Sequence, residues 1–104
     1  MTKVFISQPM RNKTEKEILK VREKAIASVK KSCGDDVEIL DSYFGHSQDT
    51  GCIPLKYLAK SLEILADADV AYFAKGWQDA RGCRIENECA IEYGIGIIED
   101  YTED

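Results

Sequence analysis

Short apolar runs alternate with longer segments in which apolar residues recur every three or four positions. The short runs are rich in β-branched and aromatic residues, and each has the length of a buried strand. They occupy residues 3–7, 37–40, 69–74 and 95–98. The third run is apolar on both faces of an extended chain, which predicts a central strand.

The longer segments between these runs have the spacing of amphipathic helices. Thr14 and Glu17 have the spacing of a capping box, and Gly34 suits the end of the helix that they begin. Pro54 suits the first turn of the second helix, and the third is expected over residues 83–93. The predicted core-facing stripes are Ile18, Arg22, Ala25, Ile26 and Val29; Leu55, Leu58, Ala59, Leu62 and Leu65; and Ile85, Cys89 and Tyr93.

Strands that alternate with helices indicate a parallel sheet covered by helices on both faces. We therefore expect an α/β fold, a Rossmann-like or flavodoxin-like three-layer sandwich with a short parallel sheet of about four strands. The 104 residues, 44% of them hydrophobic, suit a single domain. Ligands of such sheets bind beyond the carboxyl ends of the strands, where residues 7–12, 41–51 and 75–82 should meet.

Charge and cysteine content exclude several classes of function. The 19 acidic and 14 basic residues give a net charge of −5, which disfavours a nucleic-acid polymer as partner but permits a single nucleotide. No apolar run approaches the ~20 residues that span a bilayer, and no signal-peptide pattern opens the sequence. We therefore expect a cytoplasmic protein that binds no membrane, with reduced cysteines and no metal site.

The loop after the first predicted strand is one candidate binding site. Ser7, Gln8, Pro9, Met10 and Arg11 precede a helix start, where backbone amides and the guanidinium group would attract an anion. The loop matches neither the dinucleotide fingerprint nor the Walker motif. A simple turn with a solvated arginine is the alternative.

A second candidate site follows the third predicted strand. Asp79, Arg81 and Glu86 gather at this loop-to-helix junction. We expect Glu86 in the first turn of the helix, where the helix dipole favours an ionised carboxylate that can trap an oxocarbenium-like carbon. Acidic residues at a helix start are also common as mere complements of the dipole, and spacing alone favours that alternative. Trp77 could stack on a nucleobase or simply cover the end of the sheet.

Two other side chains carry weaker signals. Cys83 stands near the same helix start, where its pKa could be lowered, but no base is visible beside it. His46 lies in a polar loop without an obvious partner, which is typical of a solvated histidine.

Taken in order, these residues resemble the motifs of the nucleoside 2-deoxyribosyltransferase superfamily. The similar segments are KVFISQPMR at residues 3–11, ADVA at 68–71 and GCRIE at 82–86, followed by Ala90 and Gly94. More closely, the chain looks like a compact branch of that superfamily often carried by phages. The likeness extends from about residue 3 to residue 98.

The resemblance implies a mechanism. In that superfamily, the glutamate of a Gly-x-x-x-Glu segment attacks the anomeric carbon of a deoxynucleoside, and a new base or water then takes the sugar. Glu86, four residues after Gly82, matches that glutamate. Relatives that hydrolyse 2′-deoxynucleoside 5′-monophosphates bind the phosphate at a strand-end Ser-Ile-Arg loop, which Pro9, Met10 and Arg11 match by position. No metal or organic cofactor is implied.

The chain also departs from the family pattern. Ser61, eight residues before Asp69, stands where active members carry an aspartate, and Glu88 replaces a glycine two residues after Glu86. Asp79 is then the candidate acid. The resemblance implies cleavage or transfer at an N-glycosidic bond; the alternatives are a catalytically inactive nucleotide-binding module and a partner-binding protein on the same scaffold.

The expected site thus has catalytic and substrate-binding residues for a nucleoside or nucleotide, and the resemblance implies a homodimer or a higher homo-oligomer. The catalytic residues are Glu86 and Asp79; the substrate-binding residues are Ser7, Gln8, Pro9, Met10, Arg11, Asp41, Ser61, Trp77, Arg81 and Gly82.

Overall fold

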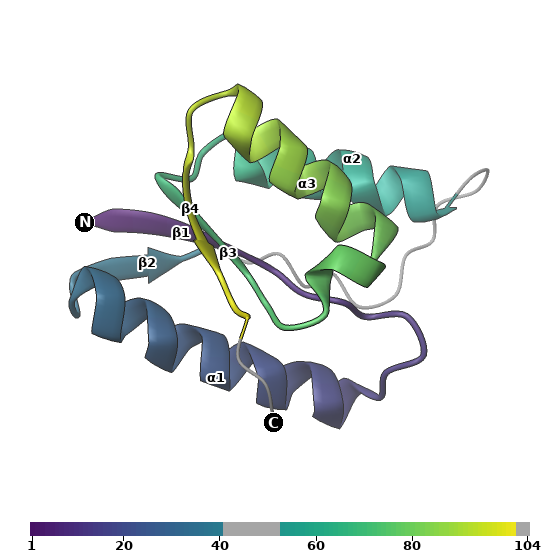
Figure 1. The fold of residues 1–104 in the computed structure, drawn as a ribbon, viewed down its shortest axis with the longest axis horizontal. Coiled ribbons are helices and arrows are strands. Elements are labelled where there is room, and N and C mark those ends of the chain that lie inside the picture. The colour runs from purple at the N-terminus through teal and green to yellow at the C-terminus, as the bar shows by residue number, and fades with distance from the viewer. Residues whose placement is uncertain (41–52, 102–104) are drawn as a thin grey trace.

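A computed structural model describes residues 1–40 and 53–101 (Figure 1). Among them, four parallel strands form one sheet in the order β2-β1-β3-β4. The strands are β1 (Thr2–Ser7), β2 (Val37–Ile39), β3 (Val70–Phe73) and β4 (Gly96–Glu99). The helices are α1 (Glu15–Cys33), α2 (Ile53–Leu65) and α3 (Arg81–Glu92), with a 3-10 turn, η1 (Trp77–Asp79), before α3.

The strand order confirms the predicted Rossmann-like or flavodoxin-like fold. It matches the first four strands of the flavodoxin-like order 2-1-3-4-5. The switch point lies between β1 and β3, because β1 pairs with β2 on one side and with β3 on the other. Ser7 pairs with Phe73 in the register of these strands, so the carboxyl ends of β1 and β3 lie side by side. The third strand is central, as predicted.

The sheet separates the helices into two layers (Figure 1), and an apolar cluster lies on each side of it. Helix α1 covers one face, and α2 and α3 cover the other. Successive residues of a strand point to opposite faces, so β1 and β3 contribute alternate side chains to both layers. The α1 layer contains Val4, Ile6, Ala25, Val29 and Tyr72, and the other layer contains Phe5, Leu65, Ala71, Phe73, Trp77, Cys83 and Ala90.

Local sequence signals account for α1. The Thr14 hydroxyl accepts a hydrogen bond from the Glu17 backbone at 3.1 Å, and the Glu17 side chain bonds back to Thr14, which completes the predicted capping box. The helix ends at Gly34, whose φ of 86° suits a residue without a Cβ atom. Ile18, Ala25 and Val29 are buried as predicted.

Helix α3 corrects the predicted apolar stripe. It begins at Arg81 rather than at residue 83, and Tyr93 is 82% exposed just beyond its end. The buried positions are instead two small and two polar residues, Cys83, Glu86, Asn87 and Ala90. The prediction was wrong for Tyr93, whereas Cys89 of the predicted stripe is partly buried and packs against the core. The fully buried positions belong to small and polar side chains that face the sheet.

Helix α2 is apolar, but few of its side chains are buried. Leu65 is its one fully buried residue, and Leu55, which the predicted stripe included, is 61% exposed. Within the described residues, no helix combines the length and apolar character that a membrane crossing needs.

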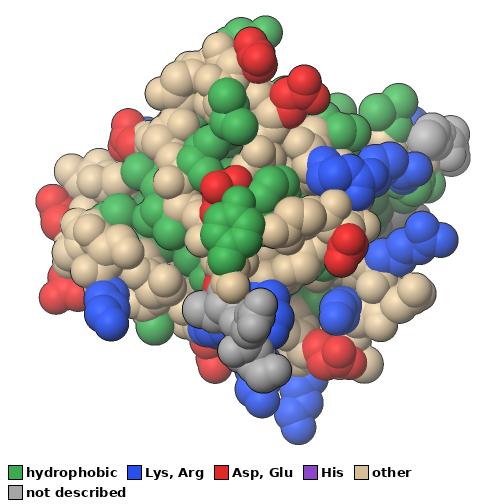
Figure 2. Space-filling view, in the orientation of Figure 1, with side chains coloured by type: hydrophobic (Ala, Val, Ile, Leu, Met, Phe, Trp, Pro, Cys, Tyr) green, Lys and Arg blue, Asp and Glu red, His purple; other side chains and the backbone are tan. Residues whose placement is uncertain are grey.

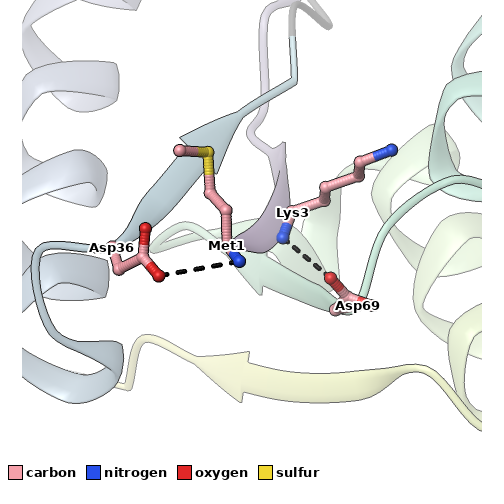
Figure 3. Close-up of polar contacts among 4 residues, drawn as sticks. All are labelled: Met1, Lys3, Asp36 and Asp69. Atoms are coloured by element: carbon pink, nitrogen blue, oxygen red, sulfur yellow. Dashed lines mark hydrogen bonds and ion pairs between the residues drawn. The ribbon is translucent and has the colours of Figure 1, made fainter.

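Polar contacts hold the amino ends of the strands together (Figure 3). The backbone N–H of Lys3 donates to Asp69 Oδ2 at 2.8 Å, and the Asp69 backbone N–H donates to the Lys3 carbonyl at 2.8 Å. The amino group of Met1 lies 3.6 Å from Asp36 Oδ2. These contacts anchor the start of β1 to the segments before β3 and β2, at the end of the sheet opposite the switch-point loops.

Candidate functional site

A buried hydroxyl–carboxyl pair lies beyond the carboxyl end of β1. Ser7, the last residue of this strand, donates from Oγ to Glu86 Oε1 at 2.7 Å. Ser7 is 2% exposed and Glu86 is 7% exposed. Ser7 points to the same face as Phe5, two residues earlier, and Glu86 lies on the buried side of α3. The pair therefore joins the sheet to α3 at the topological switch point.

Helix α2 adds a second hydroxyl group to this pair. The side chain of Ser61 lies near Glu86 and lowers the pKa of its carboxyl group. The structure thus brings together three of the predicted site residues, Ser7, Ser61 and Glu86, from β1, α2 and α3. Their separation in sequence shows that tertiary packing, rather than a local motif, creates the cluster.

Burial controls the ionisation of Glu86. It raises the pKa of the carboxyl group from 4.5 to about 7, against the opposing effects of the hydrogen bond from Ser7 and of the Ser61 hydroxyl group. The expectation of a carboxylate kept ionised by the helix start is wrong. Glu86 is the sixth residue of α3, beyond the first turn where the dipole acts, and desolvation outweighs the effects of the two hydroxyl groups. Both protonation states are populated near neutral pH.

Cys83 lies one turn before Glu86 on the same buried side of α3. Burial raises the pKa of its thiol to about 11, so the lowered pKa that its place near the helix start suggested is not found. The thiol is neutral at physiological pH. Cys33, Cys83 and Cys89 are free among the described residues.

In the first loop, Gln8 faces the opposite layer from Ser7. It is buried, and its Nε2 donates to the Ile18 carbonyl of α1 at 2.9 Å, which ties the loop to that helix. Pro9 and Met10 are half-buried, and Arg11 is exposed. The capping box already uses donors at the start of α1. Arg11 therefore lies exposed in the loop that follows Ser7, which fits both the predicted anion site and a solvated turn.

In the second loop, Trp77 covers the end of the sheet. Its ring centroid lies 5.6 Å from that of Phe73, and the residue is 9% exposed, so the ring is packed in the core rather than open for stacking. Gly82 is half-buried, whereas Asp79 and Arg81 are exposed. No hydrogen bond or ion pair recorded for the described residues connects either of these two charged side chains to Glu86.

Asn87 was missed by the sequence analysis. Its side chain is 6% exposed, and its Nδ2 donates to Glu99 Oε2 of β4 at 3.0 Å. The only available signal was a polar residue beside Glu86, which does not distinguish a buried amide from a solvated one.

Other parts of the expected site are not described. Asp41, His46 and the rest of the loop at 41–51 lie outside the described residues. Among residues 1–40 and 53–101, no group of three histidine, cysteine, aspartate and glutamate side chains has an arrangement that could hold a metal ion. Two cavities of about 190 and 210 Å³ lie around Lys24, Tyr72 and Asp100, and neither is lined by Ser7 or Glu86.

The fold and site together define an α/β protein with a buried, hydrogen-bonded glutamate at the switch point of a parallel sheet. No protein-family model, no curated protein and no solved structure matches this chain.

Proposed function

We propose that this protein cleaves, or transfers at, the N-glycosidic bond of a nucleoside, a deoxynucleoside or one of their 5′-monophosphates, with Glu86 as the nucleophile. The observation that carries the proposal is the Ser7–Glu86 pair beyond the carboxyl ends of β1 and β3, where parallel α/β sheets bind their ligands. The motif resemblance around residues 3–11 and 82–86 supports the same assignment.

The chemistry proceeds in two steps. A carboxylate oxygen of Glu86 forms a bond to the anomeric carbon, and the C–N bond breaks with its electron pair moving to the base, which takes up a proton. Water or a second base then attacks the anomeric carbon and loses a proton, and the ester C–O bond breaks so that Glu86 leaves as a carboxylate. The Ser7 hydroxyl holds one oxygen of the carboxyl group and so fixes the direction of the other.

The loops around Glu86 supply the substrate-binding part of the proposal. Arg11, exposed in the loop that follows Ser7, is the candidate contact for a 5′-phosphate. Asp79 and Arg81 are exposed in the segment after β3, on the candidate base side, and Asp79 is the candidate proton donor. The nucleophile must be ionised, so base release should rise as the pH increases through about 7.

A catalytically inactive nucleotide-binding module is the second candidate function. The observation that favours it is Ser61, whose hydroxyl group lies near Glu86. Active members of the superfamily that the chain resembles carry an aspartate at this position. A hydroxyl group can bind a sugar but is too weak an acid to protonate a departing base.

Base release separates the two candidates. The purified protein is incubated with ribonucleosides, deoxynucleosides and their 5′-monophosphates, and free base is measured by chromatography. The first proposal expects base release that Glu86→Gln abolishes and Glu88→Gln, a change of an exposed glutamate on the same helix, preserves. Nucleotide binding in calorimetry without base release would support the inactive module instead.

A further inference from the structure

The buried side of α3 has an unusual composition for a helix that packs on a sheet. Its buried residues are Cys83, Glu86, Asn87 and Ala90, two of them small and two of them polar. Small side chains interlock weakly with a sheet, so they leave the rotation of a helix about its axis poorly determined. Polar side chains that must meet partners determine that rotation more strictly.

The two polar residues contact two different strands. Glu86 accepts a hydrogen bond from Ser7 of β1 at 2.7 Å, and Asn87 donates to Glu99 of β4 at 3.0 Å. Consecutive helix residues point about 100° apart around the axis. Two contacts in different directions therefore fix the rotation, whereas one alone leaves it adjustable.

The partner of Asn87 is itself held in place. Glu99 is the last residue of β4 and pairs with Phe73 of β3 in the sheet register. Its carboxylate also lies near the Tyr101 hydroxyl, whose pKa it raises. The start of α3 has no side-chain cap at Ala80 and no acidic residue in its first turn. The Arg84 guanidinium donates to the Gln78 carbonyl at 3.0 Å, which ties this end to η1 but not to the sheet.

We propose that Asn87, held by Glu99, is a positioning residue that fixes the rotation of α3 and thereby keeps the Glu86 carboxyl group buried against Ser7. Asn87 does not touch the reacting atoms in this scheme. It acts through Glu86. An effect of Asn87 on turnover is expected only if the protein has the proposed function.

The positioning role of Asn87 affects the pKa of Glu86, which can be measured without a substrate. If the contact between Asn87 and Glu99 is lost, α3 can rotate and Glu86 can approach solvent. Because burial is the largest cause of its raised pKa, rehydration should move the pKa from about 7 back toward 4.5. Among residues 1–40 and 53–101, the groups that influence the ionisation of Glu86 are Ser7 and Ser61, and the neutral thiol of Cys83 lies one turn away; none of the three supplies a compensating charge.

The test is a carboxyl carbon NMR titration of Glu86 in the full chain and its variants. Glu99→Leu removes the acceptor, whereas Glu99→Gln removes the charge but keeps an oxygen that accepts from Asn87. We expect Glu99→Leu to lower the pKa of Glu86 by roughly one unit and Glu99→Gln to leave it near that of the wild type. Glu88→Leu, which removes an exposed carboxylate from α3, is the matched control and should change nothing.

Two results would overturn the inference. An unchanged Glu86 titration in Glu99→Leu, together with weaker resistance to urea, would show that the contact only stabilises the fold. An equal fall in Glu99→Leu and Glu99→Gln would show that charge, not the hydrogen bond, controls Glu86. If Glu99→Leu does not fold, Asn87→Ala provides the same comparison without a change in β4.

Activity then separates this inference from the proposed function. Where the wild type releases base, Glu99→Leu should lower kcat more than it changes KM, and Glu99→Gln should restore kcat. If the wild type releases no base at all, the proposed function fails while the titration still decides the role of Asn87.

Discussion

The two faces of the sheet are built by different means. On one face, α1 is fixed by its own sequence: a complete capping box begins it, a glycine with positive φ ends it, and an apolar stripe packs on Val4, Ile6 and Tyr72. On the other face, α3 has no side-chain cap at its start and turns two polar residues, Glu86 and Asn87, toward the sheet. The first face is specified locally, and the second depends on contacts between distant segments.

The difference also concerns the stability of the two faces. Burying a carboxyl group costs free energy unless partners offset the loss of water. Ser7 and Ser61 offset it only in part, because the pKa of Glu86 remains raised. Both faces contain an apolar core, and the α3 face also buries a carboxyl group whose pKa is raised by desolvation, a feature that clusters at functional sites.

The largest expected effect is the loss of turnover when the buried carboxyl group of the α3 face is changed. Glu86→Gln keeps the size of the side chain and its acceptor for Ser7 but cannot form the glycosyl ester. We expect base release to fall by at least about a thousandfold, measured by chromatography with the substrate that the panel identifies. Glu88→Gln should stay within about twofold of the wild type, because a surface charge outside the site contributes little. Unchanged turnover in Glu86→Gln would remove the nucleophile from the account.

The second contrast is in stability as a function of pH. The folded-state pKa of Glu86 is raised, so its neutral form favours the fold below pH 4.5, and this contribution is lost as the pH rises through about 7. The loss amounts to roughly 3 kcal/mol by pH 8. Urea unfolding at pH 5 and pH 8 should show a smaller fall for Glu86→Gln than for the wild type. Parallel falls in both proteins would contradict the raised pKa.

A smaller effect, a change in the pKa of Glu86, is expected when the hydroxyl group of Ser7 or of Ser61 is removed. The hydroxyl groups of Ser7 and Ser61 both lower the pKa of Glu86, and Ser7 has the stronger influence. Ser7→Ala and Ser61→Ala should therefore each raise the pKa further, with the larger rise in Ser7→Ala. NMR titration of the Glu86 carboxyl carbon measures both. A fall in either variant would mean that water replaces the missing hydroxyl and that the site is more open than the structure shows.

The smallest effect is expected on the α1 face. Thr14→Ala removes the capping box and should lower the free energy of unfolding by about 1 kcal/mol. Neither the Glu86 titration nor base release should change, because α1 packs on the opposite layer. Urea unfolding measures the loss, with Thr2→Ala, a change at the start of β1 outside any helix cap, for comparison. A coupled change in Glu86 would show that the two faces are not independent.

The sequence was sufficient where structure follows local rules. The capping box at Thr14, the stop at Gly34 and the β-branched runs predicted α1 and the parallel sheet, because these signals act within a few residues. The stripe of α3 was predicted wrongly because large apolar residues were assumed to face the sheet. Tyr93 is exposed instead, and the buried positions are small or polar.

The candidate site was predictable only in part. Glu86 and Ser7 were chosen from motif resemblance and from their place at a loop or strand end, and the structure brings them within 2.7 Å. The ionisation of Glu86 could not be predicted, because burial depends on how α2 and α3 pack. Asn87 was missed for the same reason: its partner Glu99 lies on the last strand, and no local pattern connects them.

The most direct test of the central claim is to look for the glycosyl–enzyme intermediate. The protein is mixed with the deoxynucleoside or 5′-monophosphate that it cleaves, stopped with acid within the first turnover, and examined by intact mass and peptide mapping. The account predicts an added mass of one deoxyribosyl or deoxyribosyl phosphate group on the peptide that contains Glu86, and none in Glu86→Gln. Base release without an adduct, or an adduct on another residue, would contradict it.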